Sequence, residues 1–547
     1  MTMTSQTRQL FTVIFLFFSL IAGCKNHEQQ REQTNPSNPS NPSTSPAPGE
    51  ATIPRNTGIH QAEAYSDLFF DSSHLESFIS RQKLNDTLSR QFRNFYNHRN
   101  FQFAWFAGDG LTEQALAFSS LYNYSRDSSI HRKWLDEQLD SLQKLDTLAP
   151  EGTDPSILRT ELQMTWRFIN YLNNRYTNEQ ERTTALLNFI PVKKQDPLEM
   201  ARTILSEEKD KTMNPWYDAL KSQLQRYMEI AADTSLKLIK KNPRIHLIPE
   251  LKRHLAKTGY LQNTTDTSAR LDDKLKKAIL AFQTTHGLKP DGKIQPSLIH
   301  ELNVPAITRV RQILMNLQRM IWMPSTANED KNKLILVNIP EFVLHVLENQ
   351  DRIFDMNIVV GKEGHSTVLF SGMLDRISFN PYWNIPKSIV VKEILPEMQK
   401  HKDYLREHDM EITDEKNGIP EIRQLPGEKN ELGKMKFLFP NSFNIYLHDS
   451  PHKDLFTMTE RAYSHGCIRV ADAKKLALYL LQPMPDWDEQ KIDSVLATSK
   501  ERTVKLQQPV AVLICYFTCW KGEGQMLEFR KDIYGHDRRL EKMLFKD

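Results

Sequence analysis

The sequence has few cysteines, few glycines and almost no net charge. Its 547 residues include four cysteines and 19 glycines, and 71 basic residues nearly balance 68 acidic ones, so the formal net charge is +3. Four cysteines exclude a scaffold built on disulfides. The charge balance, without a strongly basic segment, gives no reason to expect nucleic acid as a partner. Apolar residues at 39% and charged residues at 25% are typical of folded globular chains, and the length predicts about three or four domains.

An apolar run near the N-terminus has the length of an export signal rather than of a membrane span. It covers residues 10–22, which is short of the ~20 residues that cross a bilayer. The run ends at Ala22, Gly23 and Cys24, which resembles the lipobox of bacterial lipoproteins. The resemblance implies a lipoprotein signal over 1–24 and lipidation of Cys24. An ordinary cleaved signal peptide is the alternative.

A tether is predicted after the signal. Residues 25–57 contain three consecutive Asn-Pro-Ser repeats at 35–43, followed by prolines at 46 and 48. Such a segment has almost no apolar surface to bury, so we expect a disordered and partly extended linker. A linker of this kind suits the connection between a membrane and a folded body.

The first part of the folded body is predicted to be helical. Residues 58–240 contain little glycine, and their polar residues recur with helical spacing, which indicates a helical domain. The aromatic residues at 101–106 are predicted to lie in its core. Residues 241–304 predict a compact three-helix unit. The spacing of apolar residues at 310–321 predicts a long amphipathic helix in a connecting segment, 305–330. Within the first domain, helices are expected around 75–95, 114–124 and 157–174.

The pattern changes to strands after residue 331. Apolar and β-branched runs predict strands at 334–339, 342–348, 353–360, 509–520 and 525–529, with hairpin turns at 349–351 and 521–524. Between these strands, 387–407 is predicted to be helical and 417–432 to be a loop. We therefore expect a β-rich domain over 331–520 with a partly helical insertion, and a hairpin strand and tail over 521–547.

One cysteine lies in a sequence suited to nucleophilic catalysis. Cys467 follows Gly466 and comes two residues after His465. Attack by a thiol needs the thiolate, so we expect the pKa of Cys467 to fall below its free value of about 8.5. A nearby imidazole can take the proton. An amphipathic helix beginning near Asp472 would place Cys467 just before a helix N-terminus, which favours an anion.

The neighbours of this cysteine predict further parts of a site. The amides of Gly466 and Cys467 could bind an oxyanion, and Arg469 can add positive potential or bind a substrate carboxylate. The residues alone leave the base open between His465 and His448. A zinc site that includes His448 and His452 is disfavoured, because the Asp449 and Pro451 between them spoil a helical pair of ligands. We expect no metal and no cofactor.

These residues carry a resemblance to a known family. The run 464–470 resembles the signature of the L,D-transpeptidase (YkuD-type) catalytic domain, in which Ser/Thr-His-Gly-Cys precedes an apolar residue and Asn or Arg. That pattern has a histidine about 16 residues upstream, and His448 lies 16 residues before Ser464. The resemblance implies that Cys467 is the nucleophile and His448 the base. Supporting roles in the pocket and oxyanion site fall to Ser464, His465 and Gly466.

The resemblance extends beyond the signature. Residues 380–386 and 423–441 are similar to a large periplasmic subfamily that carries a helical scaffold, a peptidoglycan-binding module and a lid. Residues 241–304 resemble the small three-helix peptidoglycan-binding domain through a Gly-Tyr-Leu close, a His-Gly-Leu run and an Asp-Gly turn. The implied fold is multidomain α+β: a β-rich catalytic domain with a partly helical lid at about 386–440, a helical scaffold and the binding module. Tyr382 and Trp383 are candidate pocket walls.

The resemblance also implies a reaction and a place. The reaction is acyl transfer between peptidoglycan stem peptides through a thioester, which gives 3→3 cross-links. The implied location is the periplasm of a Gram-negative bacterium, with a lipid anchor in a membrane. A carboxypeptidase or wall-peptide hydrolase on the same site is the first alternative, and a wall-binding lipoprotein without activity is the second. The sequence leaves the oligomeric state and the binding of glycan by the module open.

Two cysteines lie near the C-terminus, at positions 515 and 519. Four strand steps span ~13 Å, whereas a disulfide needs Cα atoms within about 7 Å. They should therefore not pair with each other. We expect Cys467, Cys515 and Cys519 to be free thiols.

Overall fold

The computed structural model describes most of the chain beyond the tether. It describes residues 52–546 apart from 125–132, 144–150, 207–214, 234, 236–237, 240–246, 263–267, 324–332, 350, 363–365, 442–444, 523 and 525. The export signal, Cys24 and nearly all of the linker lie outside these residues. Residues 52–547 group into one compact unit. Within the described part of the chain, no helix combines the length and the apolar character needed to cross a bilayer.

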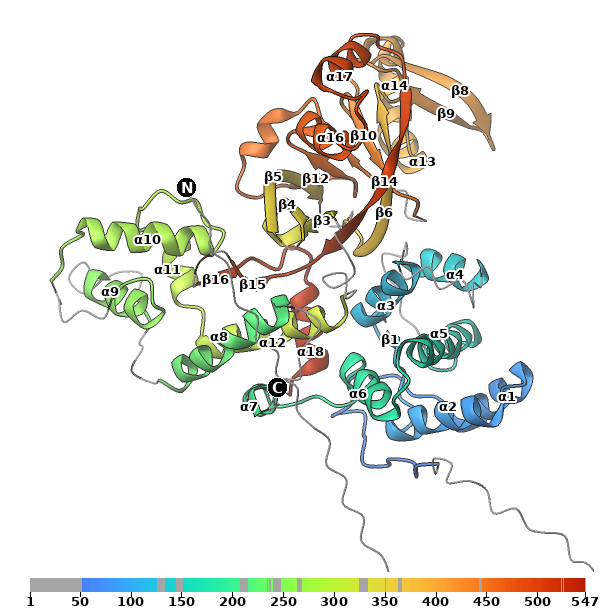
Figure 1. Cartoon of the computed structure of the whole chain (residues 1–547), viewed down its shortest axis with the longest axis vertical. Helices are drawn as coiled ribbons and strands as arrows, with labels where there is room; N and C mark the ends of the chain where they lie inside the picture. The colour runs from blue at the N-terminus through green and yellow to red at the C-terminus, as the bar shows by residue number, and fades with distance from the viewer. Residues whose placement is uncertain are drawn as a thin grey trace, which may run out of the picture. The chain divides into compact units, whose positions relative to one another are not determined.

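Helices make up the first part of this unit (Figure 1). The predicted helix at 75–95 is interrupted, because Lys83 adopts a left-handed conformation with φ 51° and the side chain of Asn85 caps a new helix. Trp105 and Phe106 are fully buried, as predicted for the aromatic cluster. The helices are α1 (Ser72–Gln82), α2 (Asp86–His98), α3 (Glu113–Tyr124), α4 (Lys133–Gln143), α5 (Pro155–Arg175), α6 (Glu179–Phe189), α7 (Pro197–Ser206) and α8 (Pro215–Ala232), with a short hairpin of β1 (Phe106–Ala107) and β2 (Gly110–Leu111).

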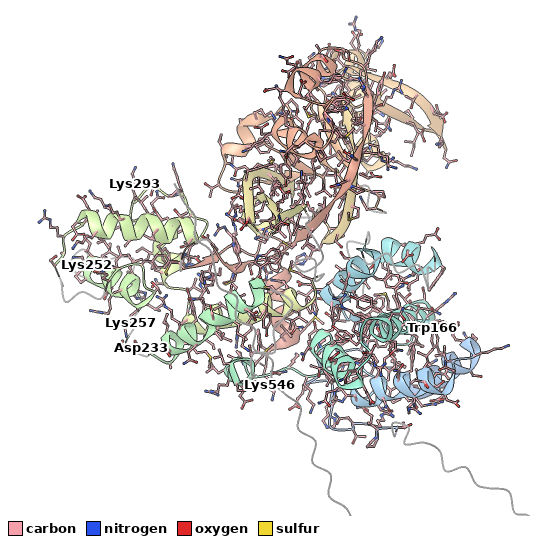
Figure 2. All side chains as sticks on the ribbon, in the orientation of Figure 1. Trp166, Asp233, Lys252, Lys257, Lys293 and Lys546 are labelled. Atoms are coloured by element: carbon pink, nitrogen blue, oxygen red, sulfur yellow. The ribbon has the colours of Figure 1, made fainter. Side chains whose placement is uncertain are left out.

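The predicted three-helix unit is confirmed. It comprises α9 (Leu247–Lys257), α10 (Asp273–Thr285) and α11 (Pro296–Leu302), around a small apolar core of its own. The ring of His286 is buried, lies 3.7 Å from the ring of Phe282 and also stacks on Phe529. This histidine of the His-Gly-Leu run is therefore a packing residue. Figure 2 labels Asp233 and Lys257, an ion pair that joins the chain just after α8 to the end of α9.

The predicted amphipathic helix at 310–321 is α12 (Ala306–Ile321). It does more than connect two domains, because it packs on α7 and α8 and its apolar residues belong to the scaffold core. The indole of Trp322 donates to the carbonyl of Phe189 at 2.8 Å. Ile313 and Leu314 are fully buried. This helix is thus a central element of the scaffold.

A closed sheet forms the second part of the unit. Its order is β12-β5-β13-β11-β10-β6-β14-β3-β4, and β4 also pairs with β5, so the sheet closes into a barrel. The predicted strands at 334–339, 342–348 and 353–360 are confirmed as β3, β4 and β5. The strands are β3 (Lys333–Asn338), β4 (Val343–Glu348), β5 (Asp351–Gly361), β6 (Phe370–Phe379), β10 (Met435–Leu438), β11 (Leu447–His448), β12 (Ala462–Ser464), β13 (Ile468–Val470) and β14 (Arg502–Cys515).

Two helices complete the core of the barrel. Leu476 and Leu480 of α16 (Ala473–Leu481) and Ile492 of α17 (Glu489–Leu496) pack into the same apolar cluster as the inward side chains of the strands. In Figure 1 both helices lie against the sheet near β10. The α+β fold class expected from the sequence is confirmed, because a helical scaffold and a three-helix module are followed by a β-rich domain.

The insertion between β6 and β10 has its own sheet and its own core. The predicted helical stretch at 387–407 is confirmed. The predicted loop at 417–432 is wrong over Ile419–Gln424, which pairs with Met410–Lys416 through a tight turn at Asn417 and Gly418, both with positive φ. The elements are β7 (Trp383–Asn384), α13 (Lys387–Ile389), a π-helical turn (Val390–Ile394), α14 (Leu395–Lys400), α15 (Tyr404–Glu407), β8 (Met410–Lys416) and β9 (Ile419–Gln424).

The C-terminal residues return to the scaffold. The predicted strand at 509–520 is broken, because β14 ends at Cys515 and β15 (Cys519–Lys521) pairs with β16 (Leu527–Phe529) in a separate hairpin. The backbone N–H of Thr518 donates to Asn316 of α12 at the break. The hairpin and α18 (His536–Leu544) then pack into the scaffold core. Cys467, Cys515 and Cys519 are free thiols, as expected.

Candidate active site

Two neighbouring parallel strands carry the residues singled out in the sequence. Strands β11 and β13 pair with Leu447 opposite Ile468 and His448 opposite Arg469. Leu447 and Ile468 are fully buried in the barrel core. Because successive side chains of a strand point to opposite faces, His448 and Arg469 take the other face, and Cys467 shares it.

The register brings the thiol and the imidazole into one neighbourhood. Cys467 precedes Ile468, so it lies beside Tyr446. Tyr446 is two residues before His448 and therefore on the same face of the sheet. Parallel strands about 4.8 Å apart with a rise of about 3.3 Å per residue put the Cα atoms of Cys467 and His448 roughly 8 Å apart on the diagonal. Side chains that lean toward each other across this diagonal can meet.

The environment of His448 favours a neutral imidazole. Its side chain is 4% exposed, and its Nδ1 lies 2.5 Å from the carbonyl oxygen of Asp449. A carbonyl only accepts, so Nδ1 carries the proton and Nε2 is the basic nitrogen. Burial, followed by the charge of Arg469, lowers the pKa of His448 to about 3. The imidazole is therefore unprotonated over the whole physiological range.

The thiol differs from the sequence-based expectation. Burial raises the pKa of Cys467, although hydrogen bonds from Tyr446 and the charges of Lys436 and Arg469 act to lower it. The expected thiolate is thus wrong for this state, which holds a neutral thiol. The expected helix dipole is also wrong as a cause: Asp472 caps α16, but β13 and about 10 Å of extended chain separate that helix from Cys467.

The loop before the cysteine is held by Ser464. Its hydroxyl donates to the carbonyl of Cys467 at 2.6 Å and accepts from the backbone N–H of Gly466 at 3.2 Å. Gly466 has φ 111°, a conformation that side chains rarely adopt, and its carbonyl accepts from Thr367 at 3.0 Å. The amide of Gly466 is therefore engaged by Ser464 in this state and does not point freely to an oxyanion.

The second histidine turns toward the insertion. The Nε2 of His465 lies 3.0 Å from a carboxylate oxygen of Glu393 in the π-helical turn. The sequence left the base open between this residue and His448. The structure places His448 on the face of Cys467 and links His465 to the insertion, which favours His448 as the base.

Arg469 is engaged by an acidic side chain. Its guanidinium donates to Glu431 at 3.1 Å and to the hydroxyl of Ser450 at 3.4 Å, and His452 contacts the same Glu431 at 3.0 Å. Its Nε is buried and has no hydrogen-bond partner among the described residues. A substrate carboxylate would have to compete with Glu431 for this arginine.

The two aromatic candidates have different surroundings. The ring of Tyr382 lies 4.2 Å from the guanidinium of Arg423 on β9, within the insertion. Trp383 hydrogen-bonds with Tyr446, which in turn bonds Cys467. The structure thus brings Trp383, but not Tyr382, to the group around the thiol.

Comparisons with known proteins agree with this geometry. Family models match residues 332–496 as the L,D-transpeptidase catalytic domain, 90–230 as the scaffold domain and 247–300 as a "Putative peptidoglycan binding domain". The β-rich part of the chain is thus similar to L,D-transpeptidase catalytic domains. A curated protein of Haemophilus influenzae, "Putative L,D-transpeptidase", is 31% identical over 246 residues, which is 42% of this chain and 49% of that protein. The chain thus spans about half the length of this relative.

Solved structures of L,D-transpeptidases are also similar. The enzyme from Mycobacterium smegmatis is 11% identical, with 34% of this chain and 59% of that chain covered and a TM-score of 0.18. The enzyme from Stackebrandtia nassauensis is 14% identical, with 50% and 91% covered and a TM-score of 0.19.

The β-rich domain contains two site residues that the sequence reasoning missed. Tyr446 hydrogen-bonds the thiol, and Lys436 of β10 places its ammonium 3.7 Å from the centre of the Tyr446 ring. Tyr446 lies two residues before His448, so strand alternation alone would have put both on one face. Lys436 lies directly opposite His448 in the sheet. No sequence signal marks that pairing.

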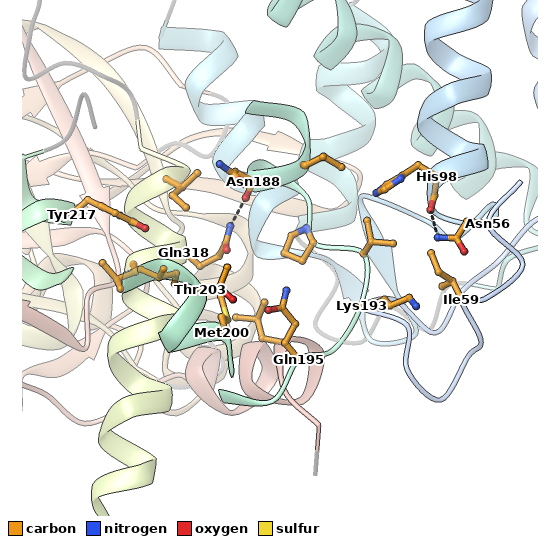
Figure 3. Close-up of a pocket in the computed structure, with 17 residues that line it drawn as sticks. Asn56, Ile59, His98, Asn188, Lys193, Gln195, Met200, Thr203, Tyr217 and Gln318 are labelled. Atoms are coloured by element: carbon orange, nitrogen blue, oxygen red, sulfur yellow. Dashed lines mark hydrogen bonds between the residues drawn. The ribbon is translucent and has the colours of Figure 1, made fainter. Parts of the chain in front are cut away.

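A cavity of about 400 Å³ lies apart from the group around Cys467. It is lined by scaffold residues that include His98, Asn188, Tyr217 and Gln318 (Figure 3). The side chain of Gln318 donates to the carbonyl of Asn188 across it. None of the residues around Cys467 lines this cavity.

Proposed function

We propose that this protein is a cysteine-dependent L,D-transpeptidase that forms 3→3 cross-links in peptidoglycan. The observation that carries the proposal is the arrangement of a thiol at Cys467 and a neutral imidazole at His448 on one face of β11 and β13, inside an L,D-transpeptidase domain. Stem peptides are the proposed substrates and the glycan is the proposed matrix.

The first half of the reaction forms a thioester. The Nε2 of His448 takes the proton of Cys467 while the sulfur attacks the carbonyl carbon of the third stem residue. The bond from that carbonyl to the nitrogen of the terminal D-residue breaks, and the proton held by His448 goes to the leaving amine. Because both groups are neutral at rest, proton transfer accompanies attack rather than precedes it.

The second half transfers the acyl group to another stem. The amine of an acceptor stem attacks the thioester, His448 removes its extra proton, and the sulfur leaves and is reprotonated. Water as the acceptor gives the carboxypeptidase reaction instead. Exclusion of water therefore decides the product. We assign the insertion between β6 and β10 as the lid, because Glu393 of the insertion contacts His465 beside the nucleophile. The expected range of about 386–440 is too long at its end, since β10 (Met435–Leu438) is a strand of the barrel.

Localisation is part of the proposal. Export to the periplasm and lipidation of Cys24 would place the enzyme on a membrane beside the wall. Replacement of this cysteine, C24A, should release the protein from the membrane fraction, and metabolic labelling with a fatty acid should mark only the parent protein. Equal membrane retention of both forms would contradict the anchor.

The proposed activity is tested on purified full-length protein with a muropeptide digest that contains tetrapeptide stems. Mass spectrometry should show cross-linked dimers, shortened stems would indicate the carboxypeptidase, and an unchanged digest would indicate a wall-binding protein without activity. C467A should abolish dimers, and H448Q should lower their rate by about 10²–10⁴-fold. H452Q is the matched control, since this histidine is half exposed and lies at the edge of the site. Dimers from C467A would refute the assignment.

A further inference from the structure

A lysine of the neighbouring strand lies beside the proposed pair. Lys436 of β10 is in register with His448 of β11 on one side and with Ser378 of β6 on the other. Its ammonium group lies over the ring of Tyr446, 3.7 Å from the ring centre. Lys436 of β10, Tyr446 just before β11 and Cys467 just before β13 thus lie on neighbouring segments of the sheet.

Lys436 differs from the lysines near it. Lys434 pairs with Glu428, and Lys453 pairs with Asp449 at 2.6 Å. In the part of the chain that the structure describes, no carboxylate forms an ion pair with Lys436. Burial lowers its pKa, opposed by the charges of Cys467 and then Glu501. A cation in such a place is stabilised by any negative charge that develops beside it.

Tyr446 connects this cation to the sulfur. Its side chain hydrogen-bonds with Cys467 and with Trp383. A cation over the face of a phenol ring is attracted by the ring quadrupole, and it polarises the O–H toward a stronger donor. The other titratable or charged groups that face the thiol are the neutral imidazole of His448 from β11 and the guanidinium of Arg469 from β13, and Arg469 is already paired with Glu431.

We propose that Lys436 is a positioning residue of the thiol site, which holds the Tyr446 hydroxyl on Cys467 and stabilises negative charge on the sulfur. This inference rests on one part of the proposed function, namely that Cys467 is the nucleophile. The ammonium group supplies a fixed positive charge that Arg469, neutralised by Glu431, supplies less well. Formation of the thiolate during attack is thereby favoured without a permanent thiolate in the resting enzyme.

The test measures how fast iodoacetamide alkylates Cys467 as a function of pH. In that reaction the thiolate sulfur forms a bond to the methylene carbon and iodide leaves, so the rate follows the thiolate fraction. Peptide mapping by mass spectrometry on the full chain reads the Cys467 peptide alone. K436M should raise the apparent pKa of alkylation, and below that pKa the rate falls about tenfold for each unit.

Matched variants separate charge from structure. K434M removes an exposed lysine two residues away and should leave the alkylation profile at the parent position. K436R keeps a cation that stacks on the ring and should restore most of the rate. If the thermal transition of K436M shows that this variant does not fold, K436Q takes its place. The double variant Y446F/K436M should have nearly the same apparent pKa of alkylation as Y446F alone, because the lysine acts partly through the tyrosine.

Each outcome bears on one proposal only. An alkylation profile of K436M and K436Q that coincides with that of the parent overturns the role of Lys436, as does failure of K436R to restore the rate. Because alkylation needs no wall substrate, a shifted profile in a protein that forms no cross-links would refute the transpeptidase activity and leave the role of Lys436 supported.

Discussion

The hydroxyl of Ser464 donates a hydrogen bond of 2.6 Å to the carbonyl oxygen of Cys467. The same oxygen atom of Ser464 accepts from the N–H of Gly466. One small side chain therefore fixes the backbone on both sides of the peptide bond between Gly466 and Cys467. The position of the sulfur relative to His448 depends on this loop.

Removal of that hydroxyl should slow dimer formation strongly while the protein still folds. In S464A the loop loses both bonds, and a displacement of about 1 Å at a reacting group can cost about 10²-fold in rate. S464T keeps a hydroxyl and should retain most of the activity. The measurement is the rate of dimer formation, with the thermal transition as a check on folding. A parent-like rate in S464A would show that the loop is held by other contacts.

Gly466 should resist replacement by any residue with a side chain. Its φ of 111° is strained for other residues, so G466A should lose about 1–2 kcal/mol of unfolding free energy and most of the alkylation rate at Cys467. Gly427 is the control, because a Cβ there meets nothing within 4 Å. G427A should leave both quantities almost unchanged. Equal effects of the two substitutions would contradict the argument.

The stability of the protein should carry a pH dependence from His448. Burial lowers the pKa of this histidine to about 3 in the folded state, whereas a histidine in the unfolded chain titrates near about 6.5. Between these values the unfolded state binds a proton that the folded state does not, so stability is full above about pH 7 and is lost as the pH falls below about 6.5.

Urea unfolding at a series of pH values checks this. The unfolding free energy of the parent should fall more steeply between about pH 6.5 and 4 than that of H448Q, which lacks the group. Identical slopes for the parent and H448Q would show that the imidazole is protonated in the folded state.

A buried ion network should dominate the stability of the scaffold. Arg319 of α12 donates to both carboxylate oxygens of Glu113 at 2.9 and 3.0 Å and to Asp537 at 2.5 Å, and all three residues are nearly buried. Removal of one partner leaves a buried charge uncompensated, so R319M should cost about 3–5 kcal/mol.

The matched control joins α12 and α18, two of the three helices that the buried network connects. Arg311 of α12 pairs with Glu541 of α18 at 2.9 Å, with both side chains about one-third exposed. R311M should cost about 0–1 kcal/mol, because exposed pairs contribute little. Both values come from urea unfolding monitored by circular dichroism. A loss for R319M no larger than that for R311M would contradict a buried network.

The sequence predicted the elements of this protein better than their pairing. The runs that became β3, β4 and β5 are apolar and β-branched, so their strands could be read directly from the sequence. The turn at Asn417 and Gly418 was also readable, since Asn-Gly between extended runs is a strong hairpin signal. The expected loop at 417–432 overlooked it.

Features that depend on distant contacts could not be read in the same way. The break after Cys515 arises because Thr518 bonds Asn316, 202 residues earlier. The role of Lys436 depends on its register with His448 across the sheet. The low pKa of His448 and the raised pKa of Cys467 both follow from burial. Motif spacing identified the two residues but could not show how deeply they lie.

The return of the C-terminal hairpin and α18 to the scaffold has a consequence for how the two halves depend on the chain. The helical core includes Phe118 and Leu314 before the barrel and Phe529 and Leu540 after it. The scaffold core is therefore completed only by segments that follow the barrel in the sequence. The barrel strands lie between β3 and β14, so the scaffold depends on a later part of the chain than the barrel does.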